Sequence, residues 1–170
     1  MDATGQLDKL DKTILEILLK DARTPYLEIA RMCDVSGATV HLRIQKLEKM
    51  NIIQGSRLIL DYKKLGLGIC AFIGIHLDKG NQLKEISPFL QSIPEIVECH
   101  YTTGHYAVIL KFHCKDTNHL RDLLVDKLQS IPGVRHTETF ISLEMNFLRE
   151  PSLTDLWTIQ DELTTSEVNP

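Results

Sequence analysis

Residues 27–55 read LEIARMCDVSGATVHLRIQKLEKMNIIQG, and this stretch decides the fold of the first part of the chain. Its pattern predicts two helices joined by a sharp turn at residues 34–36, followed by an extended segment. Ser36 is a good N-cap for the second helix, and Asp34 tolerates the left-handed backbone of a turn where glycine is more usual. Apolar residues recur at i, i+4 and i+7 of that helix, which buries one face: Val40, Ile44 and Leu47.

The other face of this second helix carries small, hydrogen-bonding and basic side chains. Small residues permit close approach to the major groove of DNA, and Arg, Thr and His side chains reach base edges or phosphates. The sequence therefore predicts a DNA-binding helix, with contacts from Ser36, Ala38, Thr39, His41, Leu42, Arg43, Lys46 and Arg57. An ordinary helical hairpin has the same local pattern, so this stretch by itself leaves both interpretations open.

Charge is unevenly distributed along the 170 residues. The net charge is −4, but residues 1–64 hold 11 Lys and Arg against 9 Asp and Glu, whereas residues 65–170 hold 8 against 14. A basic first part on an acidic remainder suits DNA contact by one domain, although a solvated helix face would carry similar charges.

The composition argues against a membrane protein, a secreted protein and an enzyme. No apolar run approaches the ~20 residues that span a bilayer, and residues 1–4 lack the basic start of a secretory signal. The cysteines show no metal-binding spacing, so we expect reduced thiols and no metal: Cys33, Cys70, Cys99 and Cys114. No nucleophile elbow, phosphate-binding glycine loop or carboxylate pair is present, so we expect neither catalysis nor a cofactor.

Residues 1–61 fit a winged helix-turn-helix domain. Apolar periodicity predicts three helices, over residues 7–20, 26–32 and 37–50. Asn51 is expected to end the third helix because asparagine tolerates left-handed geometry. Residues 53–60 follow as an extended segment that would supply the wing, and a linker is expected at residues 62–68, where glycines punctuate the chain.

The second half changes to an alternation of strands and helices. Strands are expected over residues 69–77, 96–102, 106–114 and 134–147, and helices over residues 83–93 and 120–131. Ser92-Ile93-Pro94 recurs as Ser130-Ile131-Pro132, each time where a helix ends and a strand begins. The order βαββαβ predicts a ferredoxin-like domain over residues 69–148, and hence an α+β protein. The tail, residues 149–170, is expected to form a short helix whose Trp157 packs within the chain or against another subunit.

Short motifs follow one another in a fixed order along residues 7–148. They are LDKLD at 7–11 with Ile14-Leu15, DAR at 21–23, EIA at 28–30, VS at 35–36, RIQKLE at 43–48 and IIQG at 52–55. Together these motifs resemble the Lrp/AsnC family of bacterial and archaeal transcription regulators. The segments YTTGHY at 101–106 and TET at 137–139 are most similar to the asparagine-responsive AsnC branch, whereas many relatives carry acidic residues in the loop around Gly104.

The resemblance implies a winged helix-turn-helix that reads double-stranded DNA and a C-terminal domain that senses an amino acid and assembles the protein. Members of the family pair as dimers through their βαββαβ sheets, and the dimers often form octamers. We therefore expect a cytoplasmic, nucleoid-associated homo-oligomer with no membrane partner. The effector positions that the resemblance implies are Tyr101, Thr102, Thr103, Gly104, His105, Tyr106, Gln129, Thr137, Glu138 and Thr139.

The chemistry of the loop at residues 101–106 is compatible with a small polar amino acid, with asparagine as the first expectation. Gly104 permits close approach of the backbone, and exposed N–H groups in such a turn hold a carboxylate. Hydroxyl groups and Gln129 pair with a side-chain amide. The ammonium group lacks an obvious local partner, which Glu138 or a neighbouring subunit is expected to supply.

Two other interpretations remain open from the residues. The chain could be a stand-alone amino-acid-binding or assembly module with weak or non-specific DNA binding, in which the loop at residues 101–106 is a plain hairpin turn. It could also be an enzyme on a ferredoxin-like domain, which the missing catalytic constellations disfavour. The basic residues of the predicted DNA-binding helix favour the transcription regulator.

Overall fold

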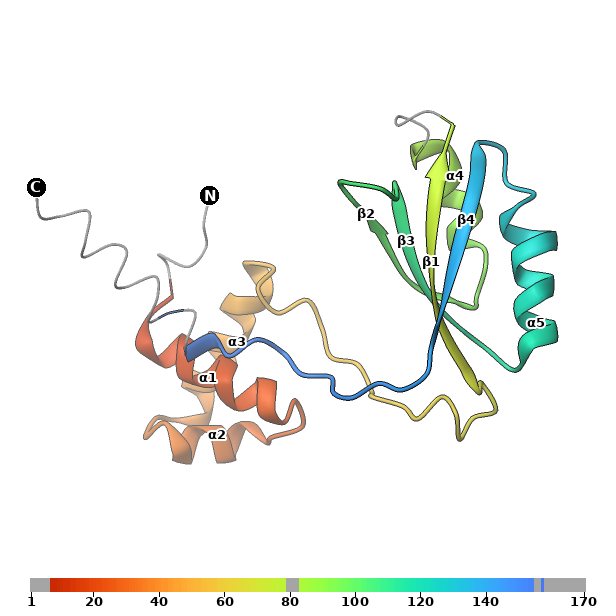
Figure 1. The fold of residues 1–170 in the computed structure, drawn as a ribbon. Coiled ribbons are helices and arrows are strands. Elements are labelled where there is room, and N and C mark those ends of the chain that lie inside the picture. Colours follow the sequence, from red (N-terminus) through yellow and green to blue (C-terminus); the bar gives the residue numbers. More distant parts are fainter. Residues whose placement is uncertain (1–6, 79–82, 155–156, 158–170) are drawn as a thin grey trace, which may run out of the picture. The chain divides into compact units, whose positions relative to one another are not determined.

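The computed structural model describes residues 7–78, 83–154 and 157, and the chain divides into two compact units (Figure 1). One unit comprises Met1–Leu58 together with Leu148–Pro170, and the other comprises Ile59–Phe147. The tail therefore belongs to the same unit as the N-terminal helices. No helix in these described ranges is long and apolar enough to cross a bilayer.

The first unit is built on three helices: α1 (Lys9–Lys20), α2 (Tyr26–Met32) and α3 (Gly37–Lys49). They confirm the expected helices, except that α1 begins later than predicted. The reason is a capping box: the carboxylate of Asp8 accepts a hydrogen bond from the backbone of Asp11, whose own carboxylate accepts one from the backbone of Asp8. Asp8 is thus the N-cap rather than part of the helix.

The turn between α2 and α3 has the predicted local geometry. Ser36 caps α3 by accepting a hydrogen bond from the backbone N–H of Thr39. Asp34, with φ 52°, and Asn51, with φ 56°, both adopt the left-handed conformation expected of them. Asn51 therefore follows the end of α3 as predicted, one residue after its C-cap Met50.

Two apolar clusters hold the first unit together. One joins the three helices through Ile14, Ile29, Ala30, Val40 and Ile44. The other joins Leu15 of α1 and Leu47 of α3 to Trp157 of the tail, which is only 9% exposed. Of the two alternatives predicted for Trp157, the structure shows packing within the chain, whereas the tail residues 155–156 and 158–170 lie outside the described residues.

The predicted wing strand over residues 53–60 is wrong for the isolated chain. No strand is present there, and Leu58, Ile59 and Leu60 are exposed. A strand is stabilised by a ladder of backbone hydrogen bonds to a neighbour, and the described part of this chain offers these residues no partner strand. The sequence pattern of residues 53–60 could not show whether a partner strand exists.

The second unit is a four-stranded antiparallel sheet with helices. Its elements are β1 (Ile69–Leu77), α4 (Leu83–Gln91), β2 (Ile96–Tyr101), β3 (Val108–Cys114), α5 (Thr117–Asp122), the π-helical turn η2 (Leu123–Leu128) and β4 (Val134–Ser142). The strand order is β2-β3-β1-β4, which is the expected βαββαβ arrangement with β4 at an edge. Figure 1 shows β1 at the centre of the sheet, between β3 and β4.

The sheet has one face against the helices and one open face. Alternate residues of β1 and β3 are fully buried against α4, α5 and η2, among them Ile73, Ile75, Leu110 and Phe112. The intervening residues of β1 point to the open face, where Phe72 is 39% exposed. Its cross-strand neighbour Phe140 on β4 is 50% exposed.

Several boundaries in this unit differ from the sequence prediction, and two of these differences have a clear physical reason. The last strand ends at Ser142 rather than at residue 147, because Ser142 pairs with Cys70 near the start of β1 and the sheet offers β4 no neighbour beyond that point. The second helical segment begins at Thr117 rather than at residue 120, because the Asp116 side chain caps it by accepting a hydrogen bond from the backbone of His119.

Candidate functional site

The outward face of α3 is narrower than the sequence suggested. Ala38, His41 and Leu42 are exposed, as predicted, whereas Thr39 is half-buried and its hydroxyl lies 2.8 Å from that of Ser36. Gln45, Glu48 and Lys49 complete this exposed face but were not among the predicted contacts. The helical spacing i, i+4 and i+7 from Ala38 was the signal that could have found Gln45. The side-chain nitrogen of Gln45 lies 3.0 Å from Nε2 of His41.

Arg43 and Lys46, two of the predicted DNA contacts, are bound to the start of α1. Arg43 forms ion pairs with Asp8 and, at 3.2 Å, with Asp11, while the Lys46 ammonium lies 2.6 Å from Asp11. The hydrogen bond to Asp8 raises the pKa of Arg43, and the backbone N–H of Asp11 lowers the pKa of Asp8. These two basic residues therefore join α3 to α1, whereas Arg57 is exposed in the irregular segment beyond α3.

The loop between β2 and β3 is a tight turn stabilised by its own side chains. The backbone N–H of Thr102 donates to Ala107 O at 3.0 Å, and the Thr102 hydroxyl donates to Tyr106 O at 2.7 Å. Gly104 has φ 115°, a conformation that favours glycine, although a Cβ there would meet no atom within 4 Å. The Thr102 hydroxyl is thus engaged by the turn, while Thr103 and His105 are exposed.

Beside this turn lies a cavity of about 480 Å³. It is lined by His76, Leu77, His105, Arg135, His136 and Glu138. His105 and Glu138 were predicted effector residues, whereas His76, Arg135 and His136 were missed. Their positions in the expected strands could have indicated these residues, because His76 and His136 are direct cross-strand neighbours in β1 and β4.

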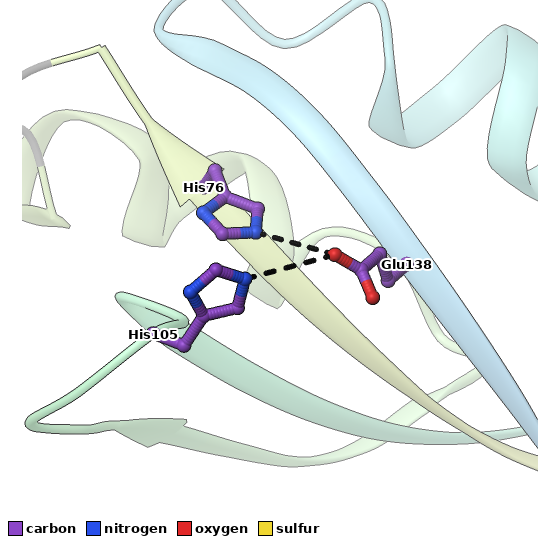
Figure 2. A group of neighbouring side chains, drawn as sticks. All are labelled: His76, His105 and Glu138. Atoms are coloured by element: carbon purple, nitrogen blue, oxygen red, sulfur yellow. Dashed lines mark ion pairs between the residues drawn. The ribbon is translucent and has the colours of Figure 1, made fainter.

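Glu138 is the centre of the polar contacts in this cavity. One carboxylate oxygen, Oε2, accepts a hydrogen bond of 2.9 Å from the Tyr106 hydroxyl, and the other, Oε1, lies 3.6 Å from His76 Nε2 and 3.9 Å from His105 Nε2 (Figure 2). The bond with Tyr106 lowers the pKa of Glu138 and raises the pKa of Tyr106. Tyr106 reaches this position because Gly74 of β1 lies beneath its ring, where a Cβ would come within 2.5 Å.

The other predicted effector residues lie away from the cavity lining. Thr137 and Thr139 alternate with Glu138 and therefore point to the opposite face of β4, where they pair with Ile75 and Ile73. Gln129 is exposed at the C-cap of η2, and Tyr101 is exposed at the end of β2. Among the described residues, the structure thus brings together His105, Tyr106 and Glu138 from the predicted set.

Comparison with known proteins places both units in one family. Residues 7–48 match the AsnC-type helix-turn-helix domain, and residues 70–150 match the Lrp/AsnC ligand binding domain. The regulatory protein AsnC of Haemophilus influenzae is 41% identical over 144 residues, which cover 85% of this chain and 96% of that protein. The AsnC protein of Escherichia coli K12 is 38% identical over 143 residues, covering 84% and 94% respectively.

Solved structures agree with this assignment. The structure of E. coli AsnC matches with a TM-score of 0.80 and 37% identity, covering 85% of this chain and 97% of that one. A Neisseria meningitidis transcriptional regulator in complex with L-Met matches with a TM-score of 0.82 and 25% identity, covering 88% and 99%. The family is one of transcription regulators rather than enzymes. This chain belongs to the Lrp/AsnC family and carries its DNA-binding helix-turn-helix and its amino-acid-binding domain.

Proposed function

We propose that this regulator binds specific DNA sequences through the exposed face of α3 and responds to a small polar amino acid, asparagine first. The observation that supports the effector site best is the cavity beside the β2–β3 turn, which is lined by both Glu138 and Arg135. A free amino acid carries an ammonium and a carboxylate, and these two side chains complement them. The volume of the cavity, about 480 Å³, falls within the range of small-molecule sites.

Asparagine is favoured over leucine because the surroundings of the cavity are polar. His76, His105 and His136 line it beside Glu138, and each imidazole nitrogen either donates or accepts a hydrogen bond. A site built on such groups penalises an apolar ligand that leaves them unpaired. The proposal is supported by the relatives named AsnC, one of them 41% identical to this chain.

Titration calorimetry of the full chain, in the presence of a metal chelator, tests the effector site. Asparagine should bind more tightly than leucine, and Glu138→Gln should weaken asparagine binding, since the neutral amide cannot form an ion pair with the ammonium. Glu144→Gln, an exposed residue beyond β4, is the matched control and should bind as the unmodified protein does. Tighter binding of leucine, or equal binding by the Glu138 variant, would refute the proposed ligand or the proposed site.

DNA recognition is proposed for Gln45 and Lys49 together with the predicted Ala38, His41 and Leu42. Gln45 is central on the exposed face, and a glutamine amide forms paired hydrogen bonds with adenine in the major groove. Lys49 is exposed in the last turn of the helix, where its charge would meet a phosphate. Arg43 and Lys46 then act mainly by fixing α3 against α1.

A DNA duplex selected from a random pool provides the test. Gln45→Ala should reduce the preference for the selected site by about 1–3 kcal/mol, because a base contact is lost. Lys49→Ala should weaken binding to all sequences and lower the salt slope by about 0.9. Lys20→Ala, an exposed lysine of α1, is the control. Binding without any sequence preference would instead favour an assembly module with non-specific DNA affinity.

Assembly through the open sheet face is proposed for Phe72 and Phe140. These aromatic side chains are direct neighbours across β1 and β4 and remain 39% and 50% exposed. We propose a homodimer on this face, further association to an octamer, and action on chromosomal DNA in the cytoplasm. Phe72→Glu should give a monomer in sedimentation analysis, whereas Val125→Glu, on an exposed position of η2, should not. A dimer that persists in the Phe72 variant would contradict this interface.

A further inference from the structure

Two histidines and a carboxylate of the proposed effector cavity also converge with the spacing of a metal site, which pairing with an amino acid does not require. The nitrogen atoms of His76 and His105 and a carboxylate oxygen of Glu138 all lie within 4.8 Å of one another (Figure 2). The two imidazole Nε2 atoms lie 3.6 and 3.9 Å from the same oxygen, Oε1. In a tetrahedral zinc site with bonds of about 2.1 Å the ligand atoms are about 3.4 Å apart, so small side-chain rotations suffice.

The carboxylate is already oriented for such a role. Tyr106 donates a hydrogen bond to Oε2 of Glu138 and leaves Oε1 directed at the two histidines. Metal-binding carboxylates commonly have a partner of this kind, which fixes their orientation. Tyr106 is itself held in place, because its ring lies against Gly74 of the central strand.

The three side chains come from elements that the sheet fixes relative to one another. His76 lies on β1, Glu138 lies on the neighbouring β4, and His105 lies in the turn just before β3. Cross-strand pairing sets His76 beside His136 and Gly74 beside Glu138, while the backbone N–H of Ala107 donates to Ile75 O at 2.9 Å. The cluster therefore lies entirely within the second unit of the chain.

We propose that His76, His105 and Glu138 bind a divalent transition-metal ion of the Zn²⁺ type. Neutral imidazole and carboxylate are preferred ligands of such ions, and two histidines with one carboxylate leave an open position for water or a further ligand. His136, whose ring centre lies 5.8 Å from that of His76, is a candidate for that position. Arg135 also lines the cavity, but it is exposed, so water screens its charge.

The competing explanation is a hydrogen-bonded cluster without a metal. In that case the two histidines are only partners of a surface carboxylate, with side chains 22% and 75% exposed, and no ion binds in stoichiometric amount. His100 provides an internal reference for this case, because it lies 3.7 Å from Glu98 on the same sheet but belongs to no three-ligand cluster among the described residues.

Metal titration of the untagged full-length chain, in the absence of DNA and amino acids, decides between the metal site and the metal-free cluster. Co²⁺ is added to chelator-treated protein and its visible absorption is followed, and Zn²⁺ is then added in competition. We expect saturation at one ion per chain, displacement by Zn²⁺, and no saturable signal in His76→Ala or His105→Ala. Tyr106→Phe should weaken the affinity by about 10–100-fold, because the carboxylate loses its orienting partner.

His100→Ala is the matched control and should bind as the unmodified chain does. His105→Ala removes an exposed turn side chain, so circular dichroism should show that this variant is folded. Absence of saturable binding, or equal binding by His105→Ala and the unmodified chain, would overturn the proposed metal site. Because no amino acid is present, that outcome would leave the proposed effector function untouched.

Discussion

A fully buried carboxylate, Asp11, connects the first helix of the DNA-binding unit to α3. Its two oxygens receive Lys46 at 2.6 Å and Arg43 at 3.2 Å, and the same side chain completes the capping box of α1. The side chains of Lys46 and Arg43 are 38% and 31% exposed, so water screens part of their charge. At the scale of single residues, Arg43 and Lys46 of α3 therefore have a structural role.

Removing Asp11 should destabilise the first unit. Loss of one partner from a fully buried ion pair costs about 3–5 kcal/mol, and we expect about 2 kcal/mol for Asp11→Ala because the two cations can still be hydrated. Trp157 is the single tryptophan and lies in this unit, so its fluorescence during urea unfolding measures the change. Glu28→Ala, on an exposed position of α2, should leave the midpoint nearly unchanged. Equal midpoints for the two variants would contradict the role given to Asp11.

Asp8 should make the stability of this unit depend on pH. Its pKa is lowered in the folded chain, chiefly by the hydrogen bond from the backbone of Asp11. Its contribution is therefore present above the unfolded pKa of about 3.9 and is lost as the pH falls through the folded value. Comparison of the unmodified chain with Asp8→Asn by Trp157 fluorescence should show a difference at neutral pH that shrinks in acid. A stability difference that grows in acid would contradict this role of Asp8.

At the scale of elements, the sheet positions the candidate site more than the turn does. A Cβ added at Gly104 would meet no neighbouring atom, so the turn requires glycine there only because of its φ of 115°. Gly74 has the opposite character: it lies in β1, far in sequence from Tyr106, yet its missing side chain makes room for the tyrosine ring. The site therefore depends on close packing between a strand and the turn beside it.

Gly74→Ala should displace Tyr106 from Glu138. A Cβ at residue 74 would lie 2.5 Å from the Tyr106 ring, so we expect a cost of about 1–3 kcal/mol and weaker asparagine binding. Tyr106→Phe is the comparison, because it keeps the ring and loses only the hydroxyl. Calorimetry on both should show reduced affinity, with lower thermal stability chiefly in the Gly74 variant. Unchanged thermal stability in that variant would contradict the close packing.

Elements were more predictable from the sequence than contacts. The apolar period of α3 and the strand patterns around β1 are local signals, and both gave elements at the expected positions. The ion pair between Arg43 and Asp11 and the packing of Tyr106 on Gly74 join residues more than 30 positions apart, so neither leaves a local pattern. The expected wing failed for a related reason, since strand formation at residues 53–60 depends on a partner that no local pattern reveals.

At the scale of the whole molecule, each unit contains part of the proposed regulator. The tail returns to the first unit, where Trp157 contacts Leu15 and Leu47. Trp157→Ala should cost about 3 kcal/mol, because it removes a nearly buried aromatic side chain from this cluster. Circular dichroism during heating would measure the loss, with Phe147→Ala, at an exposed position of the other unit, as the control. A variant as stable as the control would show that the tail contributes little.

The second unit contains the cavity with Glu138, and the family assignment joins the two functions in one chain. We propose that an amino acid bound at this cavity changes the affinity of the protein for DNA. Coupling between two sites is typically about 1–3 kcal/mol, or about 5–150-fold in affinity. A change of this size is readily measured by fluorescence anisotropy.

The decisive measurement is the affinity for a selected DNA duplex with and without asparagine, in chelator and at fixed salt, for the unmodified chain and for Glu138→Gln. We predict at least about a fivefold change for the unmodified chain. The variant should bind DNA as the unmodified chain does without asparagine, and should not respond to the amino acid. An unmodified chain that responds to no amino acid, or a variant that responds equally, would contradict the account.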